Sequence, residues 1–380
     1  MKALSIKNIF SKIITFVKKN PVLTIAFFAA LVTCFFVPFD KEYIGYFDFK
    51  TLTCLFCVLT VVCALKNINF FYVLARKIVE LFRNARVAIL ALVYITFIGS
   101  MLIANDMALL TFLPLGYYVL HTTQKEKYMA FTFIMQNIAA NLGGMLTPFG
   151  NPQNLYLYSK FSIPTGEFMA IMLPPFILSV ALITACCLVF VKPEKLLLPS
   201  KKIYLSPRRT GAYLVLFALS ILIVFRGIPY WVGLIVIPIA IGILDYKALE
   251  SVDYGLLFTF VFFFIFSGNM SRIEAVRELF STLLDKNTLL VSVTSCQVIS
   301  NVPTAILLSQ FTENYADLLV GVNIGGVGTL ISSLASLITF REYNRHNNGK
   351  TLRYIGEFSL FNFSFLLILT SFMMFLKDIV

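Results

Sequence analysis

The sequence predicts an all-α polytopic membrane protein with two inverted repeats, each with a re-entrant helical hairpin and a broken transmembrane helix. Of its 380 residues, 59% are hydrophobic and only 13% are charged, whereas a soluble domain carries about 25% charged residues. The apolar residues fall in long blocks such as 22–37 and 168–191, which match the thickness of the hydrocarbon core of a bilayer. A polar motif recurs in each half of the chain, which predicts the repeat.

Two kinds of apolar segment are expected. Two stretches, 87–120 and 288–311, carry polar residues at their centres, Ala104-Asn105-Asp106 and Ser300-Asn301-Val302. We expect both to enter the membrane and return to the same side, because non-helical backbone at that depth is tolerated only inside protein or beside a wet cavity. The segments expected to cross the membrane are 22–38, 50–65, 128–158, 168–191, 211–225, 228–245, 250–267, 314–340 and 355–376.

These segments predict the domain organisation. Segments of mixed apolar and charged residues precede both hairpins, at 67–85 and 269–286, and are typical of helices lying along the membrane interface. No small-x-small cleavage site follows the first apolar run, so we expect that span to be retained. The predicted parts are 1–45, an N-terminal cytoplasmic segment and first transmembrane helix; 46–191, repeat 1 with hairpin 87–120 and broken helix 128–158; 192–210, a cytoplasmic linker; 211–249, connecting transmembrane helices; and 250–376, repeat 2 with hairpin 288–311 and broken helix 314–340.

The distribution of basic residues supports this topology. With the N-terminus in the cytoplasm, 23 of the 31 Lys and Arg residues fall in cytoplasmic segments and 8 in external ones, as the positive-inside rule requires. If 87–120 crossed completely, the basic run 192–209 would face outward. We therefore predict a multi-pass inner-membrane protein with a cytoplasmic N-terminus and an external C-terminus, and we attribute the net charge of +12 to orientation rather than to nucleic-acid binding. The external basic residues are Lys41, Lys50, Lys160, Arg226, Arg272, Arg277, Lys286 and Lys377.

The repeat is visible in two segments that align without a gap, 141–155 and 323–337. The identical pairs are Asn141 and Asn323, Gly143 and Gly325, Gly144 and Gly326, Thr147 and Thr329, and Leu155 and Leu337. In the predicted topology the first copy runs outward and the second inward, so the repeats are inverted. The starts of the two repeats also agree, with Phe47-Asp48-Phe49 against Val252-Asp253-Tyr254.

Glycines and prolines in these motifs break a helix at the middle of the membrane. A broken helix leaves backbone N–H and C=O groups without partners. N–H groups and positive helix ends attract anions, while carbonyl and hydroxyl oxygens bind Na⁺. The alternative for the Gly-Gly pairs is tight helix packing through small residues.

Asp106 is the only carboxylate expected within the membrane. A charged carboxylate at that depth costs several kcal/mol and is usually functional, so we expect it to bind a proton or a cation. The alternative is a structural acid that caps a half-helix. His121 and His346 are expected in solvated loops. Cys54 and Cys57 have CxxC spacing without a second pair, so no metal site is expected.

The motifs at 141–154 and 300–303 resemble the broken helix and the second hairpin tip of the ion transporter superfamily, over about residues 45 to 376. That group includes citrate and dicarboxylate/sodium symporters, arsenite permeases and a class of Na⁺/H⁺ antiporters, and the resemblance implies a homodimer. In the symporters both tips read Ser-Asn-Thr, whereas here they read Ala-Asn-Asp and Ser-Asn-Val. The Asn-Asp tip resembles the arsenite and antiporter branch more closely. A carboxylate beside the site repels a polyanion unless a cation lies between them, which argues against citrate-like substrates.

Two half-sites follow from these motifs and from the resemblance. The predicted substrate-binding residues are Asn105, Asn151, Asn154, Ser300, Asn301, Thr304, Ser333 and Ser336. The predicted ion-coupling residues are Asp106, Asn105, Thr147, Gly150, Asn301, Thr329 and Ser332.

The favoured function is movement of a small anion, citrate- or dicarboxylate-like or inorganic, coupled to Na⁺ or H⁺ by alternating access. Na⁺/H⁺ exchange with Asp106 as the titrating group and arsenite efflux are the alternatives. A channel would give flux that does not saturate. No enzymatic activity and no cofactor beyond the coupling ion are expected, since an intramembrane aspartyl protease needs two carboxylates and a Ser–His pair needs an intramembrane histidine. The expected partners are the anion, the coupling cation and the lipid bilayer.

Overall fold

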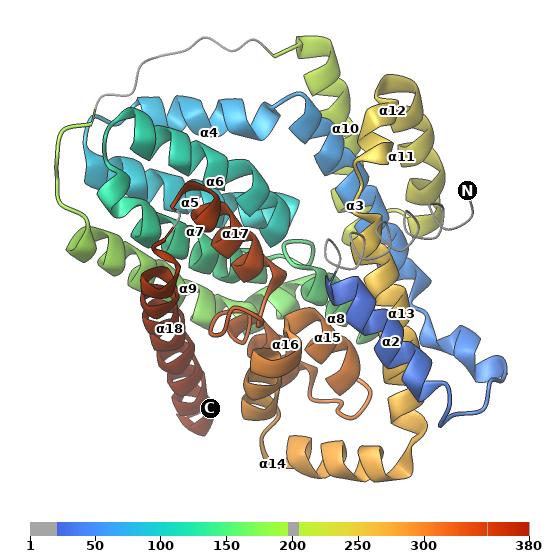
Figure 1. Cartoon of the computed structure of the whole chain (residues 1–380). Helices are drawn as coiled ribbons and strands as arrows, with labels where there is room; N and C mark the ends of the chain where they lie inside the picture. Colours follow the sequence, from blue (N-terminus) through green and yellow to red (C-terminus); the bar gives the residue numbers. More distant parts are fainter. Residues whose placement is uncertain (1–20, 197–204, 348, 380) are drawn as a thin grey trace, which may run out of the picture.

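The computed structural model describes residues 21–196, 205–347 and 349–379, which are helical throughout apart from turns and loops (Figure 1). Within these ranges no strand is assigned, and the one β-bridge joins Asn84 to Lys195. The all-α class is therefore confirmed. Residues 1–20 of the predicted N-terminal segment and 197–204 of the predicted linker lie outside the described residues.

Several helices are long and apolar enough to cross a bilayer, which confirms a polytopic membrane protein. Six meet the length and composition of a span: α3 Phe49–Asn67, α5 Ala85–Ile103, α9 Thr165–Phe190, α10 Pro207–Val224, α13 Tyr254–Arg272 and α18 Thr351–Ile379. Shorter apolar helices are α2 Pro21–Thr33, α11 Tyr230–Leu244 and α16 Tyr315–Ile324. Two small elements that were not predicted are the 3₁₀ helix η1 Lys41–Tyr46 and the helix α12 Tyr246–Glu250.

Both predicted hairpins contain a break in the helix at the predicted tip. Helix α5 ends at Ile103, and α6 Asn105–Thr122 begins two residues later and packs beside it. Helix α14 Glu274–Ile299 turns at Asn287 and is followed by α15 Asn301–Leu308. The residue between the helices has a positive φ in both cases, 66° at Ala104 and 75° at Ser300. A non-glycine residue in such a conformation costs about 1–3 kcal/mol, so the surrounding contacts must impose it.

The segments 128–158 and 314–340 are also interrupted by non-helical backbone. The first consists of α7 Met129–Gly143, the short 3₁₀ helix η3 Gly144–Leu146 and α8 Pro152–Lys160; the second consists of α16 and α17 Leu334–His346. Glycine is required where backbones approach closely, since a Cβ at Gly150 would lie 2.3 Å from the carbonyl oxygen of Gly144. Pro152 stands in the first turn of α8, where its missing N–H is tolerated.

Each break is fastened to its hairpin in the same way. The hydroxyl of Thr147 donates to the carbonyl oxygen of Met101 at 2.8 Å, and that of Thr329 donates to the carbonyl oxygen of Gln297 at 3.1 Å. Both carbonyls lie four residues before the asparagine of a hairpin tip.

The order of elements is also the same in both halves: a long helix, a segment leading into the hairpin (α4 Phe70–Glu80 or the first part of α14), the hairpin, the broken helix and a final long helix (Figure 1).

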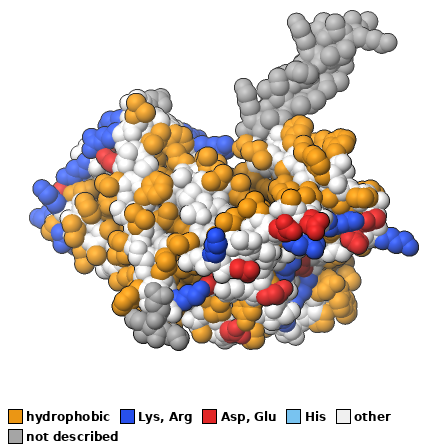
Figure 2. Space-filling view, turned by 90° about the horizontal axis from the view of Figure 1, so that it is seen from below, with side chains coloured by type: hydrophobic (Ala, Val, Ile, Leu, Met, Phe, Trp, Pro, Cys, Tyr) orange, Lys and Arg blue, Asp and Glu red, His pale blue; other side chains and the backbone are white. Residues whose placement is uncertain are grey.

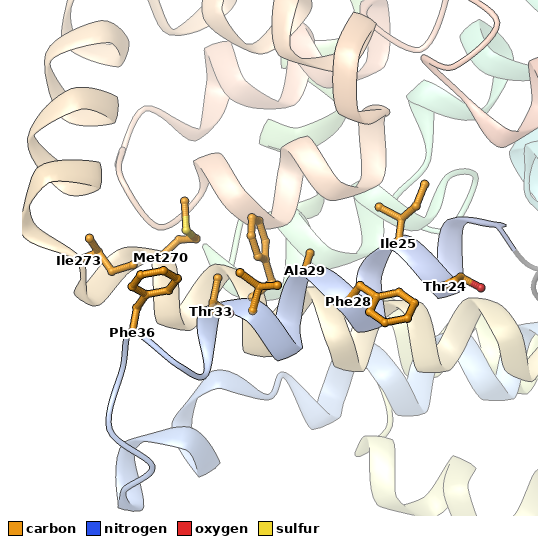
Figure 3. Close-up of a pocket in the computed structure, with 10 residues that line it drawn as sticks. Thr24, Ile25, Phe28, Ala29, Thr33, Phe36, Met270 and Ile273 are labelled. Atoms are coloured by element: carbon orange, nitrogen blue, oxygen red, sulfur yellow. The ribbon is translucent and has the colours of Figure 1, made fainter.

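Much of the surface suits a bilayer. Figure 2 shows hydrophobic side chains over large areas of one face, with basic side chains along its left edge and acidic and basic side chains across its centre and right. Between α2 and α13 an open groove of about 690 Å³ is lined by apolar side chains, among them Phe28, Phe36 and Met270 (Figure 3). Such a groove is suited to contact with lipid chains.

Helix α9 has 26 residues and is about 39 Å long. Beyond its C-terminal end, Glu194 accepts hydrogen bonds from Lys125 at 2.6 Å, Lys127 at 2.5 Å and Tyr128 at 3.0 Å. These hydrogen bonds lower the pKa of Glu194 to about 2. The start of the predicted linker is therefore fixed to the loop between α6 and α7.

We predict that Glu194→Gln lowers the melting temperature of the purified protein at pH 7. The folded-state pKa is depressed, so the stabilising contribution is present above the ordinary glutamate pKa of 4.5 and is lost as the pH falls toward 2. The difference in melting temperature between wild type and variant should therefore shrink below pH 4.5. Thermal unfolding in detergent from pH 8 to pH 3 measures this. Glu278→Gln, an exposed residue, is the control, and an equal loss in both variants would contradict the assignment.

Candidate functional site

A small cavity of about 40 Å³ lies where both hairpin tips meet the breaks of both broken helices. Four helices begin at residues that line it: α6 at Asn105, α8 at Pro152, α15 at Asn301 and α17 at Leu334. Each helix N-terminus carries unpaired N–H groups and about half a positive charge. The arrangement therefore concentrates positive potential at one point inside the protein, and such a point attracts anions.

The helix N-termini at the hairpin tips are partly satisfied by their own side chains. The side-chain oxygen of Asn105 accepts from the backbone N–H of Asp106 at 2.9 Å, and that of Asn301 accepts from the N–H of Val302 at 2.9 Å. The N–H of Asn301 donates to the carbonyl oxygen of Ser332 at 2.9 Å. The second tip is therefore tied directly to the second break.

An asparagine network joins the two halves behind the cavity. The amide of Asn105 donates to the side chain of Asn141 at 3.2 Å, and Asn151 donates to the carbonyl oxygen of Asn141 at 3.2 Å. Asn151 also donates to the side chain of Asn323 at 3.1 Å, and Asn323 donates to Asn154 at 2.6 Å. All five residues are at most 3% exposed. Asn141 and Asn323, which the sequence identifies only as an aligned pair, thus link the hairpin and the two breaks.

Asp106 has no opposite charge beside it in the described part of the chain. One of its carboxylate oxygens, Oδ1, is buried without a hydrogen-bond partner. Its side chain lines the 40 Å³ cavity and also a neighbouring cavity of about 60 Å³, which it shares with Asp253. The side-chain oxygens of Asn151 and Gln153 are likewise buried without partners. Unpartnered oxygens that include a carboxylate suit a proton or a cation.

The predicted site residues fall into two groups. Those that line the 40 Å³ cavity are Asn105, Asp106, Ser300, Asn301 and Ser333. The others lie behind it and bond to the protein. Asn154 donates to the carbonyls of Gly144, Met145 and Thr147 at 3.1–3.2 Å. Ser332 donates to the carbonyl oxygens of Gly326 and Thr329 at 3.0 and 2.8 Å. Thr304 donates to that of Ser300 at 2.7 Å.

Other buried polar residues were not predicted. Gln153 lines the cavity. The amide of Asn137 on α7 donates to Ser336 at 3.3 Å and to Asn362 of α18 at 3.4 Å. Asn137 and Asn141 are four residues apart and so share one face of α7. Two amide side chains on one face of an apolar helix indicate a buried polar contact, and this spacing is visible in the sequence.

Comparison with known proteins identifies the family. Residues 10–321 match the CitMHS family, described as citrate transporters. An uncharacterized transporter of Methanocaldococcus jannaschii, MJ0456, is 33% identical over 302 residues, which cover 78% of this chain and 82% of that protein. The inner membrane protein YbiR of Escherichia coli is 29% identical over 320 residues, covering 82% and 84%. These findings confirm the resemblance to the ion transporter superfamily, and the chain belongs to the CitMHS citrate transporter family of membrane transporters.

Proposed function

We propose that the protein is a secondary active transporter that moves a small anion, coupled to Na⁺ or H⁺, by alternating access. The observation that carries the proposal is the cavity at which four helix N-termini and the unpaired carboxylate of Asp106 meet. The helix ends provide the positive potential for an anion. Asp106 opposes the anion unless a cation or proton neutralises it, which gives a physical basis for coupling.

In this proposal the two halves are inverted repeats and the hairpins are re-entrant. Supporting observations are the shared order of elements, the positive φ at Ala104 and Ser300, and the equivalent hydrogen bonds of Thr147 and Thr329. The N-terminus is cytoplasmic and the C-terminus external, and two copies form a homodimer. Asn105, Ser300, Asn301 and Ser333 contact the substrate at the cavity. Thr147, Gly150, Thr329 and Ser332 shape the breaks that hold the cation.

One observation favours a second candidate. The cavity of about 40 Å³ has room for an ion or a water molecule but not for citrate. Anion transport therefore requires the hairpin tips to separate, whereas Na⁺/H⁺ exchange at Asp106 does not. Arsenite is smaller than citrate, so its transport requires a smaller separation of the hairpin tips. Uptake of labelled citrate, succinate, arsenite and sodium into proteoliposomes distinguishes these functions.

We predict the sidedness of both hairpins from single cysteines in a variant without its seven native cysteines. Thr122→Cys, at the end of α6, should react with an impermeant maleimide only from the cytoplasmic side. Lys286→Cys, before the kink of α14, should react only from outside. Labelling of both positions from the same side would contradict inverted hairpins, and labelling in detergent controls for reactivity.

We predict that Asp106→Asn lowers concentrative uptake by about tenfold or more, which corresponds to about 1.4 kcal/mol. The substitution keeps size and hydrogen bonding but removes the charge that holds the coupling ion. Folding should survive, because a neutral amide is cheaper to bury than a carboxylate. The measurement is uptake per folded protein, together with its dependence on Na⁺ and on pH.

Asp285→Asn, at an exposed position on α14, is the matched control and should transport normally. If Asp106 only caps α6, the Asn variant will lose thermal stability but keep uptake and ion dependence per folded molecule. That outcome would assign the coupling ion to the oxygens around Asn151 and Gln153 instead.

A further inference from the structure

A second, larger cavity of about 470 Å³ lies at the end of the molecule where α3 and α8 meet. Its lining is polar and includes two lysines, Lys50 from the first turn of α3 and Lys160 from the last turn of α8. Ser159, Ser162, Ser271 and Gln310 line it as well. No side chain of the 40 Å³ cavity lines this one. Residues from four separate segments of the chain thus converge on a hollow of the size of a small-molecule site.

The charge inside this cavity is positive. Lys50 makes no hydrogen bond and no ion pair among the described residues, and the ammonium group of Lys160 donates only to the side-chain oxygen of Gln310, at 3.2 Å. Asp48 is the one acidic residue in the lining, and both its carboxylate oxygens accept hydrogen bonds from the first turn of α3. They accept from the N–H of Thr51 at 2.9 Å and from its hydroxyl at 2.6 Å. The ammonium groups of both lysines therefore have N–H donors available to bind a ligand.

Two arginines brace the walls of the cavity. Arg226 donates to the carbonyl oxygens of Tyr158 at 2.6 Å and Ser162 at 3.2 Å, and its guanidinium lies 4.1 Å from the centre of the Tyr158 ring. On the other side Arg272 donates to the hydroxyl of Tyr46 at 3.1 Å and to Asp40 at 2.5 Å. Arg226 thus fixes the backbone on both sides of Lys160, and Arg272 fixes the Tyr46 side chain in the lining, before any ligand arrives. Such preorganisation lowers the entropic cost of binding.

The distribution of basic residues argues against chance. Only 8 of the 31 basic residues lie on the face predicted to be external, where the positive-inside rule disfavours them. Two of these eight, Lys50 and Lys160, line this cavity, and two more, Arg226 and Arg272, hold its walls. Half of the basic residues on that face therefore serve one small region.

We propose that this cavity is a second anion-binding site, which takes a small multivalent anion through its carboxylate or phosphate groups. Lys50 and Lys160 bind the charged oxygens, and the serine hydroxyls and the amide of Gln310 complete the contacts. The ligand is either a free anion or the headgroup of an anionic lipid, since both present the same chemistry. Because α8 runs from the 40 Å³ cavity to Lys160, over about 13 Å for its nine residues, a bound anion ties the far end of α8 to α3.

The test uses the full chain in nanodiscs of a neutral lipid and sodium-free buffer, with binding of citrate and of inorganic phosphate measured by calorimetry. The double variant Lys50→Gln/Lys160→Gln should bind at least one of these anions about tenfold more weakly or worse. The matched control Lys41→Gln/Lys286→Gln removes two exposed charges from the same face and should bind as the wild type does. Repeating the measurement in an Asn301→Ala background separates this site from the central one, because binding at the second site should persist there.

A second arm identifies the source of the ligand. If the site holds a lipid headgroup, adding phosphatidylglycerol to the nanodiscs should raise the melting temperature of the wild type and of the control variant but not that of the double lysine variant. Anion binding and lipid response that are both the same in the double lysine variant as in wild type would overturn the proposal. Lysine-dependent binding in a protein that transports none of the tested solutes would leave this site standing and reject the proposed function.

Discussion

The burial of helix ends at the centre of the molecule is the constraint on which the rest of the structure depends. Helices α6, α8, α15 and α17 all begin at one small cavity. The first N–H groups of each helix have no carbonyl of their own helix to donate to. Asparagine and serine side chains meet part of this demand; Ser333, for example, accepts from the N–H of Ala335 at 3.2 Å. The primary role of the polar residues at the breaks is structural, because a buried broken helix is not stable unless its backbone groups find hydrogen-bond partners.

The same constraint explains the strain at the hairpin tips. Ala104 and Ser300 adopt nearly the same unfavourable conformation, with ψ of 153° and 158°. Each is followed by an asparagine whose side chain bonds the next N–H, and each hairpin is fastened to a break by a threonine. Two segments of different sequence thus share one geometry. That geometry opens each helix toward the cavity, and this is what an ion or substrate site requires of a backbone in a membrane.

The sequence predicts the tips and breaks because glycine, proline and asparagine interrupt apolar runs there. It does not predict the individual hydrogen bonds between the halves, since the bond from Asn323 to Asn154 depends on how α8 and α16 cross. The kink at Asn287 falls between the predicted interfacial segment 269–286 and the predicted hairpin 288–311, and there the asparagine side chain accepts from the N–H of Leu290. The sequence does not predict the cavity between Lys50 and Lys160, because the two residues lie far apart in the chain and no motif links them.

Electrostatics give the two cavities different roles along one helix. Helix α8 presents its positive N-terminal end to the central cavity and places Lys160 at its C-terminal end, where a cation offsets the negative end of the dipole. An anion is thus attracted at both ends of α8. At the central cavity, however, Asp106 opposes that attraction, whereas at the second cavity the carboxylate of Asp48 is occupied by Thr51. With the second anion site added to the proposed function, an anion binds the second cavity without a cation but enters the central cavity only after Asp106 has been neutralised. That requirement at Asp106 makes transport dependent on the coupling ion.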